Sequence, residues 1–255
     1  MSVEFEVTGQ VARVTLNRPD RLNAVDQSTF EHLNEIWSEI NRRDDVRCTV
    51  LTGTGRAFCA GADMKEEGPD GIEYWVQTNR HGFSGIACGG RLNVPLLAKV
   101  NGLALGGGFE TILGCDIVIA AESASFGLPE SRVGRLPLDG MIVLPRMVPR
   151  NLALGLMLTG RRISARQAAE WGIVNEVVPD DLLDRTVEKW VEDILSCAPL
   201  SLKAIKSFVF DTTGMEVHEA RRYMSETLSV ALKCEDSHEG VKAFKEKRLP
   251  VWKGR

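Results

Sequence analysis

The sequence lacks any apolar run that approaches the ~20 residues needed to span a bilayer as a helix. Its first residues, MSVEFEV, alternate like a strand and contain neither a basic segment nor an apolar segment of the kind that directs secretion. They are also not rich in Arg and Ser, so no transit peptide is predicted. We therefore expect a cytoplasmic protein that does not bind membranes.

Metal-binding and nucleophile motifs are also scarce. None of the six cysteines forms a C-x-x-C pair, so a zinc site is not predicted. The four histidines are scattered, and nothing in their spacing favours a Ser-His-Asp or Cys-His enzyme. The net charge of −4 argues against a nucleic-acid partner. We expect no metal and no separate cofactor.

The remaining pattern is that of a globular chain in which strands and helices interleave to about residue 180, followed by helices alone. Alternating residues predict a hairpin over 3–17, turning at Gly9-Gln10, and apolar residues at helical spacing predict a helix over 26–42. Near the end, helices are expected over 215–233 and 236–248. This order indicates an α/β protein with a helical tail. Periodicity taken alone favours a doubly wound sheet.

The most informative stretch runs from residue 97 to 140. An apolar strand is followed by Asn101-Gly102 and then by three glycines, Gly106 to Gly108, at the start of a helix. Without β-carbons the backbone can approach a ligand closely, and the free N–H groups of the first helical turn suit an oxyanion or a phosphate. Two acids, Glu110 and Glu130, could converge on that site and transfer protons beside a carbonyl group.

A purely structural interpretation of the same residues stays open. Three glycines can form a tight loop, and a glutamate in a first helical turn can simply complement the helix dipole. Two known phosphate motifs do not fit, however. No Gly-Lys-Ser/Thr follows the glycines, and GLALGGG lacks the G-x-G-x-x-G spacing.

Longer segments carry a specific resemblance. VNGLALGGGFE at 100–110, Cys115-Asp116 and FGLPE at 126–130 together resemble the signature of the enoyl-CoA hydratase/isomerase (crotonase) family. The similarity extends over nearly the whole chain. It implies a spiral of repeated β-β-α units over residues 1–195 and a C-terminal helical region over 196–255 that makes trimer contacts. The implied assembly is a homotrimer or a dimer of trimers, and the implied substrate is an acyl-CoA of fatty acid metabolism.

The resemblance also implies roles for individual residues. Glu110 would orient and deprotonate water, and Glu130 would exchange the proton at the α-carbon. The N–H groups of Ala62 and Gly107 would form an oxyanion hole for the thioester oxygen. Coenzyme A, as part of the substrate, would contact Asn23, Ala24, Ala60, Lys65 and, from a neighbouring subunit, Phe244 and Lys247. For Lys65 and Lys247, an ordinary solvated lysine is the alternative.

Two departures from the family pattern affect the acyl pocket. Hydratases often have Pro-Gly-Ala-Gly-Gly where this chain has PLDGM at 137–141, so Leu138 and Met141 should reshape the pocket. Some isomerases of the family carry an acid at the place of Leu138, which is absent here, although Asp139 is adjacent. The WGIVN segment at 171–175 and the ending EKRLPVWKGR are most similar to the carnitinyl-CoA dehydratase branch.

The leading functional hypothesis is therefore a hydro-lyase that reversibly adds water to a 2-enoyl-CoA. The nearest rivals are a double-bond isomerase that uses Glu130 alone and a carnitinyl-CoA dehydratase-type enzyme with a polar acyl group. Two other classes are an RNA-binding member of the family, which the acidic charge disfavours, and an inactive CoA-binding scaffold, which retention of both acids disfavours.

Overall fold

The computed structural model describes residues 1–65, 72, 75 and 81–255. The helical piece expected around Ile72, Trp75 and Val76 falls largely outside the described residues.

A six-stranded sheet forms the centre of the molecule, in the order β1-β2-β3-β5-β7-β10. Its strands are β1 (Val3–Thr8), β2 (Val11–Leu16), β3 (Cys48–Gly53), β5 (Leu96–Val100), β7 (Ile117–Ala121) and β10 (Glu176–Val178). The β1–β2 pair is the predicted antiparallel hairpin, and the remaining pairs are parallel. The central strands β3, β5 and β7 contribute buried apolar residues on both faces, as expected for a sheet that is covered on both sides.

A second sheet of four short strands lies beside the first, in the order β4-β6-β8-β9. It consists of β4 (Ala57–Cys59), β6 (Leu103–Leu105), β8 (Ser125–Gly127) and β9 (Arg162–Ser164). The chain alternates between the sheets: β3 leads to β4, β5 to β6, and β7 to β8. This alternation agrees with the β-β-α spiral that the family resemblance implied, and the single doubly wound sheet suggested by periodicity is wrong.

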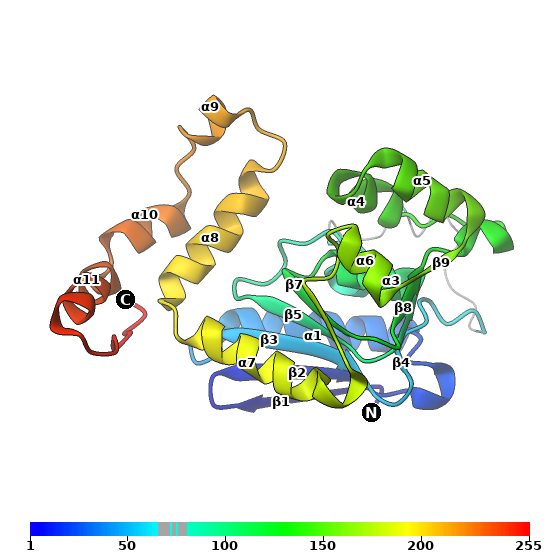
Figure 1. Cartoon of the computed structure of the whole chain (residues 1–255), viewed down its shortest axis with the longest axis horizontal. Helices are drawn as coiled ribbons and strands as arrows, with labels where there is room; N and C mark the ends of the chain where they lie inside the picture. The colour runs from blue at the N-terminus through cyan, green and yellow to red at the C-terminus, as the bar shows by residue number, and fades with distance from the viewer. Residues whose placement is uncertain (66–71, 73–74, 76–80) are drawn as a thin grey trace.

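Helices pack against the two sheets and against one another (Figure 1). They are α1 (Gln27–Arg42), α3 (Gly107–Leu113), α4 (Gly140–Met147), α5 (Arg150–Thr159), α6 (Ala165–Glu170) and α7 (Leu183–Leu195). The carboxylate of Asp26 caps α1, accepting the Thr29 N–H at 2.7 Å. Successive residues of β5 point to opposite sides, so Leu97 packs with α7 while Leu96 and Ala98 join the main core between the sheets.

Four further helices project from this body as an arm (Figure 1), which we call the C-terminal arm. They are α8 (Pro199–Thr212), α9 (Val217–Ala220), α10 (Glu226–Lys233) and α11 (Glu235–Glu246). The single helix expected over 215–233 is wrong, because residues 221–225 leave the helical path and Ser225 caps a new helix by accepting the Leu228 N–H at 3.2 Å. The predicted division after residue 195 falls between α7 and α8 and stays a prediction.

The last residues of the chain fold back on the C-terminal arm. The Asp236 carboxylate accepts the N–H groups of Lys253 and Gly254, both at 2.8 Å. The Trp252 indole N–H donates to the Ser196 carbonyl at 2.7 Å, which fastens the tail to the end of α7. None of the described helices combines the length and apolar character that crossing a membrane requires.

Candidate active site

The glycine turn predicted to bind the substrate lies where β6 of the small sheet passes into α3. The Gly106 N–H donates to the Gly127 carbonyl at 2.9 Å, which ties the turn to β8. A second small-residue segment runs directly beside it: a β-carbon on Gly61 would lie 3.1 Å from the Gly107 nitrogen. Gly61 also has φ +93°, a left-handed conformation that favours glycine. The two segments can approach this closely only without side chains.

The predicted oxyanion donors, Ala62 and Gly107, belong to these two neighbouring segments. Backbone hydrogen bonds from Val25 to Gly61 and from Asp63 to Val25, at 2.8 and 3.0 Å, hold Ala62 in place. Gly107 is the first residue of α3, so its N–H has no partner within the helix. Within the described ranges, no backbone hydrogen bond uses the N–H of Ala62 or Gly107. The geometry leaves both groups available to an oxygen atom of a ligand.

Glu110 lies in the first turn of α3 and is almost completely buried, with 5% of its surface exposed. Its Oε1 accepts two backbone N–H groups at the start of α4, from Asp139 at 3.1 Å and from Gly140 at 2.8 Å. Burial is the main cause that raises the pKa of Glu110 to about 8, and the neighbouring carboxylates of Asp139 and Glu130 raise it further. The two N–H groups oppose this shift without cancelling it.

Glu130 opens a short 3-10 helix, Glu130–Val133, that follows β8. Its Oε1 lies 2.8 Å from where a β-carbon on Gly106 would be, so the carboxylate faces the glycine turn. Its Oε2 is buried and has no hydrogen-bond partner among the described residues. Burial raises the pKa of Glu130 above its ordinary value. The structure therefore brings both predicted acids to one turn, where a substrate atom or a water could bind the free oxygen.

One buried acid next to these glutamates was missed as a site residue. The carboxylate of Asp139, 6% exposed, accepts the Phe83 N–H at 2.7 Å and the Cys88 thiol at 3.4 Å. Phe83 in turn lies against the glycine turn, because a β-carbon on Gly107 would lie 2.6 Å from three of its ring carbons. The sequence singles out Asp139 only as the residue after Leu138, the position at which some isomerases of the family carry an acid.

The four N-terminal residues predicted to contact coenzyme A lie on loops next to Ala62. Asn23 is 1% exposed, and its amide donates to the carbonyls of Thr54 and Ala57 at 2.9 and 2.8 Å. Its side chain therefore fixes the loop, so any contact with substrate falls to its backbone. Ala24 is buried, Ala60 is half-buried with its N–H bonded to Leu22, and Lys65 is exposed.

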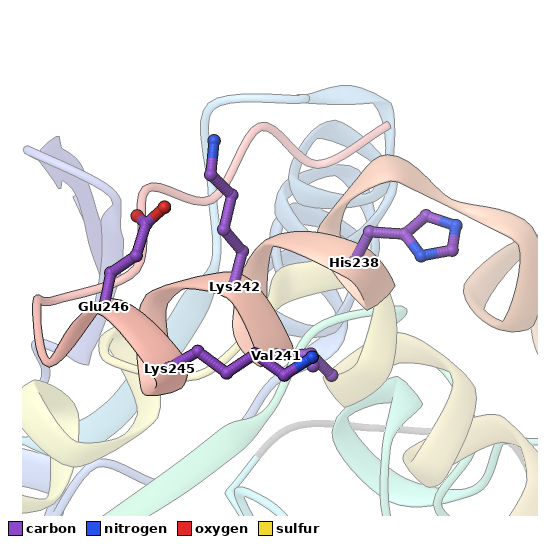
Figure 2. Close-up of a pocket in the computed structure, with 5 residues that line it drawn as sticks. All are labelled: His238, Val241, Lys242, Lys245 and Glu246. Carbon is purple, nitrogen blue, oxygen red and sulfur yellow. The ribbon is translucent and has the colours of Figure 1, made fainter.

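Phe244 and Lys247 are not brought to the glutamates. They lie at the end of α11, at the far end of the C-terminal arm from α3 (Figure 1), and Phe244 is 86% exposed. A hollow on the same helix is lined by five side chains that all project from α11 (Figure 2). They are His238, Val241, Lys242, Lys245 and Glu246. None of them belongs to the glutamate site, so this hollow is not its acyl pocket.

Comparison with known proteins settles the family. The family model described as enoyl-CoA hydratase/isomerase matches residues 6–255. This chain belongs to that family. It is 38% identical over 256 residues to the (E)-benzylidenesuccinyl-CoA hydratase of Thauera aromatica, covering 100% of both chains. It is 37% identical to the carnitinyl-CoA dehydratase of Escherichia coli strain K12, covering 100% of this chain and 99% of that protein.

A solved structure of the family shares the fold. The crystal structure of an enoyl-CoA hydratase from Bacillus anthracis superposes with a TM-score of 0.92 at 35% identity, covering 100% of both chains. The chain is thus a hydro-lyase of the enoyl-CoA hydratase type, a crotonase-family hydratase or dehydratase that acts on acyl-CoA thioesters.

Proposed function

We propose that the protein reversibly hydrates a 2-enoyl-CoA thioester, with Glu110 and Glu130 as its two acid–base groups. One observation carries this proposal: the buried carboxylate of Glu110 and the half-buried carboxylate of Glu130 lie beside the 106–108 turn, and Glu130 keeps a buried oxygen, Oε2, without a partner in the described part of the chain. A hydratase needs this pairing, because water must lose one proton while the α-carbon of the substrate gains one.

In the proposed reaction, the thioester oxygen accepts the N–H groups of Ala62 and Gly107. These donors stabilise the negative charge that develops when water adds to the β-carbon and the enolate forms. Glu110 takes a proton from the attacking water, and Glu130 delivers a proton to the α-carbon. Exchange of protons with solvent then returns Glu110 to the ionised form and Glu130 to the protonated form. The C=C double bond becomes C–C, and the elements of water are added across it. Dehydration is the reverse sequence.

The raised pKa of Glu110 suits both directions. A group whose pKa lies near neutral pH can accept a proton from water and return it to a leaving hydroxyl group without a large energetic cost in either step. A pKa of about 8 leaves a fraction of Glu110 ionised at neutral pH for hydration, and the protonated form is ready for dehydration. Ionisation of Glu110 should therefore make hydration accelerate as the pH rises, for as long as Glu130 keeps the proton that it delivers.

The rest of the predicted binding site belongs to the same proposal. The backbone around Asn23, Ala24 and Ala60 would contact the pantetheine arm, and Lys65 would lie near the adenosine end. Phe244 and Lys247 are far from the glutamates of their own chain, which supports their predicted contact with the coenzyme A of a neighbouring subunit. Apolar side chains that are exposed along the C-terminal arm support its predicted role in a trimer or a dimer of trimers. They include Ile205, Val209, Phe210, Val230 and Leu232.

The identity of the acyl group is a separate choice. Met141 lies next to Gly140, whose N–H holds Glu110, and it is 38% exposed at a position where the family often has glycine. A larger side chain there supports a pocket that differs from that of a simple short-chain hydratase. The two curated relatives are named for benzylidenesuccinyl-CoA and carnitinyl-CoA, and we include a polar acyl group of this kind as the alternative substrate class.

The experiment is to follow the loss of the enoyl-thioester absorbance with crotonyl-CoA for the wild type, Glu110→Gln and Glu130→Gln. Glu170→Gln, on the exposed end of α6, serves as the control for loss of a carboxylate. Loss of one acid–base group should slow hydration by about 10²–10⁴-fold, while the control keeps the wild-type rate. Rapid double-bond migration without hydration, surviving Glu110→Gln, would instead make the protein an isomerase. If crotonyl-CoA is not hydrated, the same comparison with bulkier and polar enoyl-CoAs decides the acyl class.

A further inference from the structure

Asp139 connects the two halves of the site through contacts on both its backbone and its side chain. Its N–H donates to Oε1 of Glu110 at 3.1 Å, together with the N–H of Gly140. Its carboxylate turns the other way and accepts the Phe83 N–H and the Cys88 thiol. The fit is tight, because a β-carbon on Gly82 would lie 2.7 Å from the carboxyl carbon and from both oxygens.

The loop that carries Phe83 reaches the part of the site that contains the proposed oxyanion donors. Phe83 is 7% exposed, and its ring occupies the space in front of Gly107, one of the two proposed oxyanion donors. Nothing larger than hydrogen at residue 107 would leave the ring where it is. Because Asp139 holds the backbone of Phe83, a displacement of the Asp139 carboxylate would loosen the ring from the glycine turn.

We propose that Asp139 is a positioning residue: as a buried acid beside Glu110, it links the turn that binds Glu110 to the loop that carries Phe83 over Gly107. This inference rests on the proposed function, because it assigns Glu110 the role of acid–base group. It adds a third acid to the site, one that need not touch substrate to affect the reaction.

The surroundings of Glu110 single out Asp139 as the charged neighbour to test. The start of α4 contributes Asp139, the 3-10 helix after β8 contributes Glu130, and the 82–88 loop contributes the thiol of Cys88. Burial raises the pKa of this thiol to about 12, so it is neutral at the pH of the reaction. Among these groups, Asp139 raises the pKa of Glu110 more than Glu130 does.

Two substitutions separate the hydrogen bonds of the Asp139 carboxylate from its charge. Asp139→Asn keeps a carbonyl oxygen for the Phe83 N–H and places an amide N–H against the sulfur of Cys88, while it removes the charge. Asp139→Ala removes both. The matched control is Asp236→Asn, because Asp236 is a buried aspartate that also accepts two hydrogen bonds, from Lys253 and Gly254, but lies on the C-terminal arm.

The measurement is the pH profile of kcat/KM for hydration. The increase of kcat/KM with pH reports ionisation of Glu110. In Asp139→Asn this increase should move to lower pH by about one unit, because a like charge has been removed. In Asp139→Ala we expect the same displacement plus a loss of kcat of about 10-fold or more at the optimum, since small misplacements of catalytic groups are costly. Asp236→Asn should leave the position of the rise unchanged.

A second readout does not depend on activity. In protein labelled with ¹³C at the glutamate carboxyl carbon, the resonance lost in Glu110→Gln reports Glu110 directly, and its titration should also move to lower pH in Asp139→Asn. If this titration moves while no enoyl-CoA is hydrated, the proposed function fails and the electrostatic part of the inference stands. If hydration occurs and neither the titration nor the pH profile moves in Asp139→Asn, or if both move equally in Asp236→Asn, the inference is overturned.

Discussion

Glu110→Gln should stabilise the protein increasingly as the pH rises from 5 to 8, while it slows hydration by about 10²–10⁴-fold. The reason is that the folded protein holds a proton on Glu110 that the unfolded chain releases: the pKa rises from an ordinary 4.5 to about 8 on folding. Stability is therefore fully present below about pH 4.5, where both states are protonated, and falls as the pH rises through the folded pKa. Glutamine has the same shape, keeps an oxygen for the N–H groups of Asp139 and Gly140, and carries no proton to lose.

The size of the effect follows from the same two pKa values. The difference between these pKa values lowers the free energy of unfolding of the wild type by about 1 kcal/mol at pH 5, about 3 kcal/mol at pH 7 and about 4 kcal/mol at pH 8. These are upper values, because a new amide N–H must find a partner where Oε2 of the glutamate was. For a domain of this size, about 3 kcal/mol corresponds to a rise of about 6–12 °C in the melting temperature.

The assay is equilibrium unfolding in urea, read by tryptophan fluorescence at pH 5, 7 and 8 and at one fixed protein concentration. A fixed concentration matters because subunit association would itself alter the apparent stability. Glu170→Gln, which changes an exposed glutamate, is the control and should show no stabilisation that grows with pH. The reasoning is refuted if the stability difference between Glu110→Gln and the wild type is the same at pH 5 and pH 8.

Three further outcomes are expected. Gly107→Ala should lower kcat for hydration by about 10²–10³-fold, because the new methyl group would lie 2.6 Å from ring carbons of Phe83 and must displace an oxyanion donor; wild-type kinetics would contradict this. Trp37→Phe removes the indole N–H that donates to the buried Ser84 carbonyl at 2.7 Å, and should cost about 1–3 kcal/mol in urea unfolding. Asp26→Ala removes the cap of α1 and should cost about 1 kcal/mol, measured by the same unfolding curves, with an unchanged midpoint counting against the cap.

Local signals predicted much of the larger sheet and its helices. The hairpin depends on alternation around one glycine turn, and α1 depends on a capping aspartate and a regular apolar stripe, so both could be derived from contiguous residues. The smaller sheet could not be derived in this way. Its strands are three residues long, and Leu103 to Leu105 finds its partners at Ala57 to Cys59 and at Ser125 to Gly127. Three residues carry too little periodicity to distinguish a strand from a loop.

The same distinction applies to the site. Glu110 was a candidate because it follows three glycines, and Glu130 became one through its place after a strand and the family pattern around it. No sequence pattern marks Asp139 as a site residue. Its importance comes from the hydrogen bond that it accepts from Phe83, 56 positions away, and from the one that its N–H donates to Glu110. Contacts of that range depend on the completed fold. A buried acid without a motif is therefore the kind of site residue that sequence patterns miss.

The stability that Glu110 costs and the reactivity it offers have one physical origin. Removing the carboxylate from water raises its pKa, and this destabilises the ionised form in the folded protein by the same free energy that makes it a stronger base toward water. A site that gave Glu110 a cationic partner would recover that stability and lose the base. Here the backbone N–H groups of Asp139 and Gly140 instead hold the Glu110 side chain in place without neutralising it, and the nearby Asp139 carboxylate raises its pKa further. A stabilising effect of Glu110→Gln that appears only as the pH rises, together with loss of hydration, would show both consequences of this arrangement in one variant.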